Sequence, residues 1–298
     1  HRILIPAFSQ RARRLYFDAM REIAGKLVTH WRASDEQWLD VSADMTRLTL
    51  DTIALCGFGQ RLDSFTREQM HPFVQAMVRV LEEAMARSTR PRWLNRLRFS
   101  AKQGFKQDIA YLHDFVDEVI RHRRTTPTPV KDLLGLMLEG AEPVSGQQLS
   151  DTNIRYQVIT FLIAGHETTS GLLSFALYFL TQHLTTLARA VAEVDAVLPS
   201  GAELTYEDLD KLIVVEQVLE ETLRLWPTAP AFSVAPYQET VLPGGYTLAK
   251  DQRVTVLLPA LHRDPAAWER PEAFDIDRFA PERRASISPH AFKPFGDG

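Results

Sequence analysis

A long, almost wholly apolar helix with polar residues at its midpoint constrains this chain more than any other feature. Residues 151–182 predict one continuous helix, capped by Ser150 or Asp151 and about 48 Å long at about 1.5 Å per residue. A helix that is apolar around most of its circumference is buried in a large core. Its middle, residues 164–170, contains a glycine, a carboxylate and two threonines. These residues cost stability there unless they have partners or a function, so we expect the chemistry of the protein in this segment.

Side chains three and four positions apart share one face of a helix. One stripe with small residues between bulky ones therefore consists of Phe161, Ala164, Gly165, Thr168 and Leu172. Such a notch lets a flat group approach the helix backbone. The Thr168 hydroxyl can bond the Ala164 carbonyl and open the helix locally. With the acid Glu167 beside it, an opened turn suits proton delivery. The alternative is a helix-packing notch whose polar groups are satisfied in the core.

Composition limits the class of protein. The chain has 298 residues, of which 45% are hydrophobic and 24% charged, as in ordinary globular proteins with a large core. A net charge of −4 gives no reason to expect a nucleic-acid partner. His166 and Glu167 in the middle of the long helix argue against a membrane span, so we expect no obligatory membrane association. The single cysteine, Cys56, fits a cytoplasmic protein and is interpreted as a buried, inert thiol.

Two partial motifs are rejected. His166 and Glu167 begin like the helix of a zinc protease, but Ser170 stands where the second histidine is required. The segment 57–59 begins like a dinucleotide-binding loop, but the third glycine is replaced by Leu62 and no strand precedes the segment. The sequence therefore predicts neither a zinc-protease site nor a dinucleotide fingerprint.

The remainder of the chain is predicted to be helical up to residue 226 and irregular beyond it. Besides the long helix, hydrophobic periodicity predicts helices over 8–32, 41–58, 72–86, 104–122, 131–138, 185–197 and 206–226. Short strands are predicted at 240–242, 246–248 and 254–258, with a hairpin turn at 243–245. The predicted fold class is mainly α with a small β-sheet. A helical body would cover residues 1–226, and a proline-rich, small-sheet region would cover residues 227–298.

An acid and an arginine stand three positions apart on one helix face, at Glu221 and Arg224. Most such pairs are surface salt bridges of little energetic value. Here the neighbouring residues are apolar, so a buried, bidentate pair is expected. A buried pair needs a third polar partner, for which Arg278 is a candidate.

Four segments resemble, in this order and spacing, the cytochrome P-450 family. Residues 164–169 resemble its oxygen-activating helix, and residues 221–224 match its acid–arginine motif. Residues 274–279 resemble the segment that supplies the third member of that triad, and residues 292–298 resemble the start of the haem-binding loop. The resemblance covers the whole chain and is greatest with bacterial self-sufficient fatty-acid hydroxylases, whose haem domain is fused to a diflavin reductase. It implies a cytochrome P-450 fold, truncated at both ends.

The resemblance also implies a function. The protein would be a haem-thiolate monooxygenase that inserts one atom of O2 into a C–H bond of a medium- or long-chain fatty acid or a similar apolar molecule. Haem b would be its cofactor, and NADPH would supply electrons through the FAD and FMN of a fused or separate reductase. Thr168, with Glu167 nearby, would deliver protons to oxygen bound at the haem. Residues implied to contact the haem are His1, Ala164, Gly165, Thr168, Phe292, Phe295 and Gly296.

Further roles are implied by the same resemblance. An apolar substrate channel would be lined by Leu81, Ile163, Ala164 and Ala229. Glu221, Arg224 and Arg278 would hold the proximal side of the haem. The cysteine that binds the iron would come four positions after Gly298, so no metal ligand is expected within the chain. We therefore expect residues 1–298 to be an internal fragment, a partial haem domain that is inactive alone.

Two other functions stay open. A peroxide-driven haem peroxygenase would need no reductase, but Thr168 and Glu167 argue against it, because such an enzyme needs no proton delivery to dioxygen. A helical protein that binds an apolar ligand without chemistry becomes the better hypothesis if the complete gene lacks the cysteine.

Overall fold

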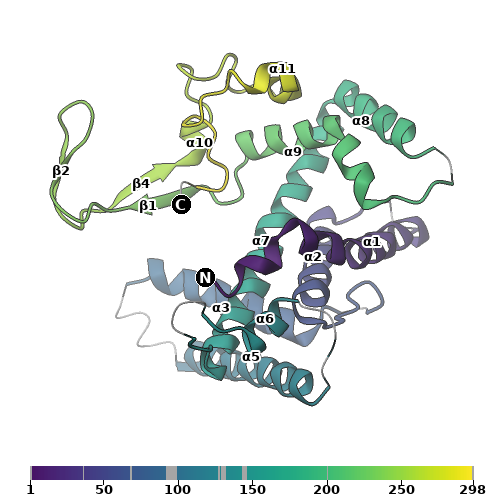
Figure 1. Cartoon of the computed structure of the whole chain (residues 1–298), viewed down its shortest axis with the longest axis vertical. Coiled ribbons are helices and arrows are strands. Elements are labelled where there is room, and N and C mark those ends of the chain that lie inside the picture. Colours follow the sequence, from purple (N-terminus) through teal and green to yellow (C-terminus); the bar gives the residue numbers. More distant parts are fainter. Residues whose placement is uncertain are drawn as a thin grey trace. The chain divides into compact units, whose positions relative to one another are not determined.

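The structure is a computed structural model of the chain and describes residues 2–35, 37–67, 69–91, 99–126, 128, 132–142, 146–199 and 201–296. These residues are predominantly helical, with two small two-stranded sheets (Figure 1). The chain divides into two compact units, His1–Ser170 and Gly171–Gly298, and the boundary falls within the long helix α7, Asp151–Gln182. This boundary lies before the change of composition at Pro227, because helices that precede the proline pack with the segments that follow it.

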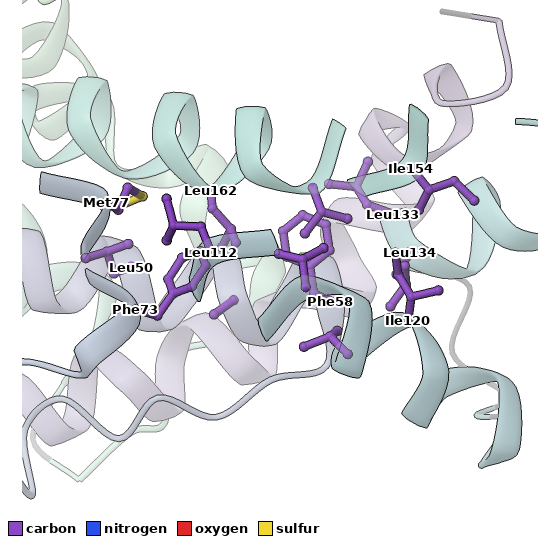
Figure 2. Packing of buried hydrophobic residues seen from close by; sticks show 14 of the residues in the cluster. Leu50, Phe58, Phe73, Met77, Leu112, Ile120, Leu133, Leu134, Ile154 and Leu162 are labelled. Atoms are coloured by element: carbon purple, nitrogen blue, oxygen red, sulfur yellow. The ribbon is translucent and has the colours of Figure 1, made fainter. Parts of the chain in front are cut away.

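The first unit is a bundle of helices around an apolar core. A 3-10 turn, η1 (Ile5–Phe8), leads into α1 (Gln10–Ala33), which packs against α2 (Val41–Phe58). The helix α3 (Pro72–Thr89) packs along α5 (Phe99–Thr125), and α6 (Leu133–Glu139) contacts α2. Figure 2 shows the core between these helices and α7, with Phe58, Phe73 and Leu134 at most 1% exposed.

Side chains outside the helices determine where several of them begin and end. Ser9 caps α1, Asp40 caps α2, and Ser150 caps α7 through its Oγ, which accepts a hydrogen bond from an amide of the first turn. Each cap satisfies one of the N–H groups that a helix start leaves unpaired. The helix α2 ends at Gly59, whose φ of 66° lies in the left-handed region that glycine adopts at low cost. The predicted cap at Ser150 is therefore confirmed.

The second unit combines short helices with the strands. After the end of α7 come α8 (Leu184–Val197), η2 (Tyr206–Lys211), α9 (Ile213–Leu225), β1 (Ala231–Val234), β2 (Thr240–Val241), β3 (Thr247–Leu248), β4 (Val254–Leu257), α10 (Leu258–Leu261), η3 (Ile276–Phe279) and α11 (Pro281–Arg284). Strand β1 pairs antiparallel with β4, and Phe232 lies opposite Val256. Strands β2 and β3 form an antiparallel hairpin (Figure 1), and Gly244 in its turn has a φ of 89°.

Most predicted elements are present, but one predicted helix is divided, and the short elements β1, α10, η3 and α11 are additional to the prediction. The predicted helix over 206–226 is two elements, η2 and α9, which are separated at Leu212. The carboxylate of Glu193 accepts hydrogen bonds from the Val214 and Val215 amides, so a new helix begins there. Strand β1 was not predicted, because prolines at 227 and 230 obscure its pattern. Within the part of the chain that the structure describes, no helix is long and apolar enough to cross a membrane.

Candidate functional site

The polar residues in the middle of α7 divide into buried and exposed ones. His166 is only 4% exposed, and its Nδ1 lies 2.8 Å from the Leu162 carbonyl. The carbonyl of His166 accepts a hydrogen bond from Thr49 Oγ1 at 3.1 Å, which links α7 to α2. Ser170 is also buried, and its hydroxyl donates to the Glu167 carbonyl. These two polar side chains are satisfied inside the first unit and hold the helix in place.

Thr168 lies on the exposed side of the same helix. Its Oγ1 donates to the Ala164 carbonyl at 2.9 Å, as predicted. The helix is nevertheless continuous from Asp151 to Gln182, so the expected local opening is wrong. A carbonyl oxygen has two lone pairs and can accept the threonine hydroxyl while it keeps its helical bond. Thr160, Ala164, Glu167 and Thr168 are all exposed, and they form an accessible face of α7.

Gly165 has a different neighbourhood from Ala164. A Cβ atom added to Gly165 would lie 2.9 Å from Cγ1 and 3.2 Å from Cδ1 of Ile53 on α2. Real Cβ atoms do not approach other atoms so closely, so only glycine fits against Ile53. The expectation that Gly165 contributes to an open notch is therefore wrong, and this position is a helix-packing contact. The open part of the predicted stripe is reduced to Ala164 and Thr168.

The residues proposed for the substrate channel have unequal exposure. Leu81 and Ile163 are partly buried and pack against the core of the first unit. Ala229, in the second unit, is exposed after the end of α9. His1, which was expected to approach a haem propionate, lies outside the described residues.

Glu221 and Arg224 form the buried, bidentate pair that was predicted. Arg224 Nε donates to Glu221 Oε2 at 2.7 Å and Arg224 Nη2 donates to Glu221 Oε1 at 2.8 Å, and both side chains are 0% exposed. The other guanidinium hydrogens go to the carbonyls of His262, Pro271 and Ala273. An arginine has five N–H donors, so Arg224 makes every hydrogen bond that its side chain can donate. The pair therefore fixes the path of the chain over residues 262–273.

Arg278 is the third member of this group. Its Nε lies 3.4 Å from Glu221 Oε1, and its Nη2 donates to the Arg270 carbonyl at 2.8 Å. Glu221 Oε1 also accepts the amide N–H of Asp275 at 2.8 Å. Burial raises the pKa of the Glu221 carboxyl, and the hydrogen bonds from Arg224 act in the opposite direction. The structure thus brings together all three residues of the predicted triad.

His262 belongs to this cluster and was missed in the sequence. Its side chain is 0% exposed, its Nδ1 lies 3.2 Å from the Arg224 carbonyl, and its Nε2 accepts the Lys293 amide at 3.0 Å. These partners are 38 and 31 positions away in the chain, so no local pattern could reveal them. Trp268, also missed, places its ring 5.1 Å from the Arg224 guanidinium.

The segment that resembles the start of a haem-binding loop begins in an aromatic cluster and ends exposed. Phe292 is half-buried, and its ring lies 4.9 Å from that of Phe279 and 6.3 Å from that of Trp268. Phe295 is 88% exposed, which is unusual for a phenylalanine ring. Gly296 has a φ of 79°, a conformation that favours glycine. A firmly held segment therefore presents one apolar ring to its surroundings.

Comparison with known proteins identifies the family to which this helical fold with its buried triad belongs. The sequence pattern of the family described as Cytochrome P450 matches residues 1–298, so the chain belongs to this family. The chain is 50% identical over 303 residues to the bifunctional cytochrome P450/NADPH–P450 reductase 2 of Bacillus subtilis (strain 168) and 47% identical over 302 residues to the bifunctional cytochrome P450/NADPH–P450 reductase of Bacillus cereus. All of the chain is aligned, but it spans only 28% of the length of each relative. The solved cytochrome P450DA heme domain is 50% identical, with a TM-score of 0.94, and the match covers all of this chain and 64% of that one.

The residues present in each unit fit a haem. In the first unit, Ala164 leaves the backbone of α7 accessible beside the Thr168 hydroxyl on an exposed face of the helix. In the second unit, the ring of Phe295 is exposed on a segment that His262 holds. Ala164, Gly165, Thr168, Phe292, Phe295 and Gly296 stay predictions as residues that would contact the group.

Proposed function

We propose that the protein to which this chain belongs is a cytochrome P450 monooxygenase that hydroxylates medium- or long-chain fatty acids or similar apolar molecules. The observation that carries this proposal is the accessible Thr168 hydroxyl, bonded to the Ala164 carbonyl on an exposed face of α7. When bound, the haem, with a cysteine thiolate as iron ligand, supplies oxygen activation and oxidation of the substrate C–H bond. The cysteine is placed four positions after Gly298 in this proposal.

Thr168 would hold and transfer a proton. Because its hydroxyl hydrogen points to the Ala164 carbonyl, the oxygen lone pairs are free to accept a hydrogen bond from a donor on the exposed side. Glu167, exposed one position earlier, can exchange protons with solvent. Together they would hold a proton on the exposed face of α7, where Glu167 meets solvent and the Thr168 Oγ accepts a hydrogen bond.

The remaining residues have supporting roles in the proposal. Leu81, Ile163, Ala164 and Ala229 would contact an apolar chain. Glu221, Arg224 and Arg278 would hold the proximal segment. The bifunctional relatives support NADPH as electron source, with transfer through the FAD and FMN of a fused reductase. The single cysteine supports a cytoplasmic location.

Replacing Thr168 tests the proposal. In the complete protein, with a long-chain fatty acid, Thr168→Ala is expected to lower the hydroxylated product formed per NADPH consumed by about tenfold or more, because a proton donor is lost. Thr168→Ser should restore most of this ratio. Thr160→Ala is the matched control, because Thr160 is exposed on the same helix and makes the same kind of bond, from Oγ1 to the Tyr156 carbonyl at 2.7 Å.

Three outcomes would contradict the proposal. If Thr160→Ala lowers the ratio as much as Thr168→Ala, the effect is one of helix stability and not of proton delivery. Sustained turnover with hydrogen peroxide, and none with NADPH, reductase and dioxygen, would favour a peroxygenase. Binding of a fatty acid without turnover under either condition would favour a protein that only binds an apolar ligand.

A further inference from the structure

The ring of His262 connects two separate parts of the second unit. It lies just after α10, is 0% exposed, and contacts a backbone group through each ring nitrogen. The Arg224 carbonyl, 3.2 Å from Nδ1, can only accept a hydrogen bond, so Nδ1 carries the hydrogen. The Lys293 amide, 3.0 Å from Nε2, can only donate, so Nε2 is a bare acceptor. These two partners define one neutral tautomer of the ring.

Each partner is a backbone group at a structurally important place. The helix α9 ends at Leu225, so the Arg224 carbonyl is one of the last four carbonyls of this helix. These four receive no hydrogen bond from an amide of the same helix. His262 satisfies this carbonyl. Lys293 lies in the segment 292–296, whose Phe295 ring is exposed. The imidazole therefore ties the end of a buried helix to the backbone of this segment.

The surroundings favour the neutral ring. The Arg224 guanidinium donates to the His262 carbonyl at 2.9 Å, and the Phe292 ring lies 5.3 Å from the imidazole. Burial lowers the pKa of His262. The backbone carbonyls of Arg224 and Leu223 act in the opposite direction, and the nearby cations of Arg224 and Arg263 lower the pKa as well. The carboxylates of Glu221 and Glu272 are bonded to Arg224 and Arg263. A second ring proton would point at the Lys293 N–H and break the contact.

We propose that His262 is a positioning residue, whose unprotonated Nε2 holds the Lys293 amide and thereby sets the place of residues 292–296 relative to the buried Glu221–Arg224 pair. The bond itself is independent of the proposed function, but its consequence rests on that function, in which residues 292–296 begin the haem-binding loop. Other backbone bonds of the segment, such as that from the Gly296 amide to the Lys293 carbonyl at 3.0 Å, are local. They shape the turn but do not locate it in the unit.

Two substitutions separate the two ends of the connection. In His262→Gln, the longer side chain places an amide oxygen near the position of Nε2, where it can accept the Lys293 N–H. In His262→Asn, the shorter side chain places an NH2 group near the position of Nδ1, where it can donate to the Arg224 carbonyl but cannot reach Lys293. Each variant loses one of the two bonds of the ring, so the pair is matched in the number of hydrogen bonds lost.

Hydrogen exchange of the Lys293 amide, measured at single-residue resolution in the complete protein, is the test. The amide is expected to exchange about five- to tenfold faster in His262→Asn than in the parent, as the loss of one hydrogen bond predicts, and close to the parent rate in His262→Gln. The Gly296 amide is an internal control and should keep its rate in both. Equal rates for Lys293 in the parent and His262→Asn, or equal acceleration in both variants, would overturn the proposal.

A measurement on the parent protein decides the matter if a variant fails to fold. Selective 15N labelling of histidine is expected to show the Nδ1–H tautomer of His262 between pH 6 and 8. The His262 signals are assigned by their absence from His262→Gln or by through-bond connection to the Lys293 amide. A charged ring or the Nε2–H tautomer would refute the inference. The proposed function is tested separately, by the spectrum of the parent protein after reduction and addition of carbon monoxide. If this spectrum is not of the thiolate type, the proposed function is wrong, but the hydrogen-exchange result for Lys293 remains valid.

Discussion

Replacing Arg224 by lysine separates the geometry of the guanidinium from its charge. Arg224 uses all five of its N–H groups in buried hydrogen bonds, two of them to Glu221. Lysine has three N–H groups on one nitrogen, so at least two acceptors lose their partner. A buried acceptor without a partner costs about 1–3 kcal/mol, so two of them predict a loss of about 2–6 kcal/mol for Arg224→Lys.

Arg189→Lys is the matched control for this substitution. Arg189 also makes a bidentate pair, with Asp277 at 2.7 and 3.2 Å, but its side chain is 47% exposed and that of Asp277 is 50% exposed. Exposed ion pairs contribute about 0–1 kcal/mol, so this variant should lose no more than that. The two substitutions therefore have the same chemistry in the same unit and differ in burial.

The exchange of the amide hydrogens of α9 in the complete protein measures both effects. A loss of about 2–6 kcal/mol corresponds to exchange faster by a factor of about 30 or more, whereas a loss of about 1 kcal/mol or less gives at most a few-fold change. If α9 in Arg224→Lys exchanges at the rate found in Arg189→Lys, the saturated hydrogen bonding of Arg224 does not stabilise the second unit and the reasoning is wrong.

Three further predictions concern packing and titration. Gly165→Ala should lower the free energy of unfolding by about 1–3 kcal/mol, because the new Cβ would lie 2.9 Å from Ile53. Gly25→Ala is the control: a Cβ there meets no described atom within 4 Å, so this variant should be neutral or stabilised. Thermal unfolding of both variants measures the difference. Cys56, 7% exposed and with its pKa raised to about 11 by burial, should not react with a thiol reagent at pH 8 until the protein is unfolded; native labelling would contradict this. Burial lowers the pKa of His262 in the folded protein. As the pH falls below about 6.5, the histidine of the unfolded chain therefore binds a proton before that of the folded protein does. The stability that the neutral ring contributes is full above this pH and is lost below it. The stability of His262→Gln should fall less between pH 7 and pH 5, in urea unfolding at each pH, than that of the parent.

The helices that the sequence predicted best are those whose own residues determine them. The bounds of α2 and α7 agree with the predicted ranges, because long apolar periodicity and caps at Asp40 and Ser150 are local features. The division of the predicted helix 206–226 into η2 and α9 depends on Glu193, which lies on a different helix. A single-sequence pattern has no access to such a contact, so it extended one helix across both elements.

The same distinction applies to the candidate site. The Glu221–Arg224 pair could be predicted because both residues share one helix face and their neighbours are apolar. The Thr168 bond to Ala164 follows from the spacing of four residues. What fills the stripe beside Gly165 depends on α2, and the prediction of an open notch there was wrong. The role of His262 depends on partners 38 and 31 positions away, and its residue type alone contains no sign of it.

Buried ion pairs are poor evidence of stability, because removing two charges from water costs several kcal/mol before they attract each other. The arrangement around Arg224 has a different consequence, since three of its five bonds go to the carbonyls of His262, Pro271 and Ala273. These residues lie outside regular helices and strands, so no backbone ladder of a helix or sheet defines their path. Apolar residues of similar volume at positions 221 and 224 would avoid the desolvation cost but would leave those carbonyls, and through His262 the Lys293 amide, without a defined position. The buried charges are therefore best explained by the precision with which they place residues 262–296, and not by the stability that they add.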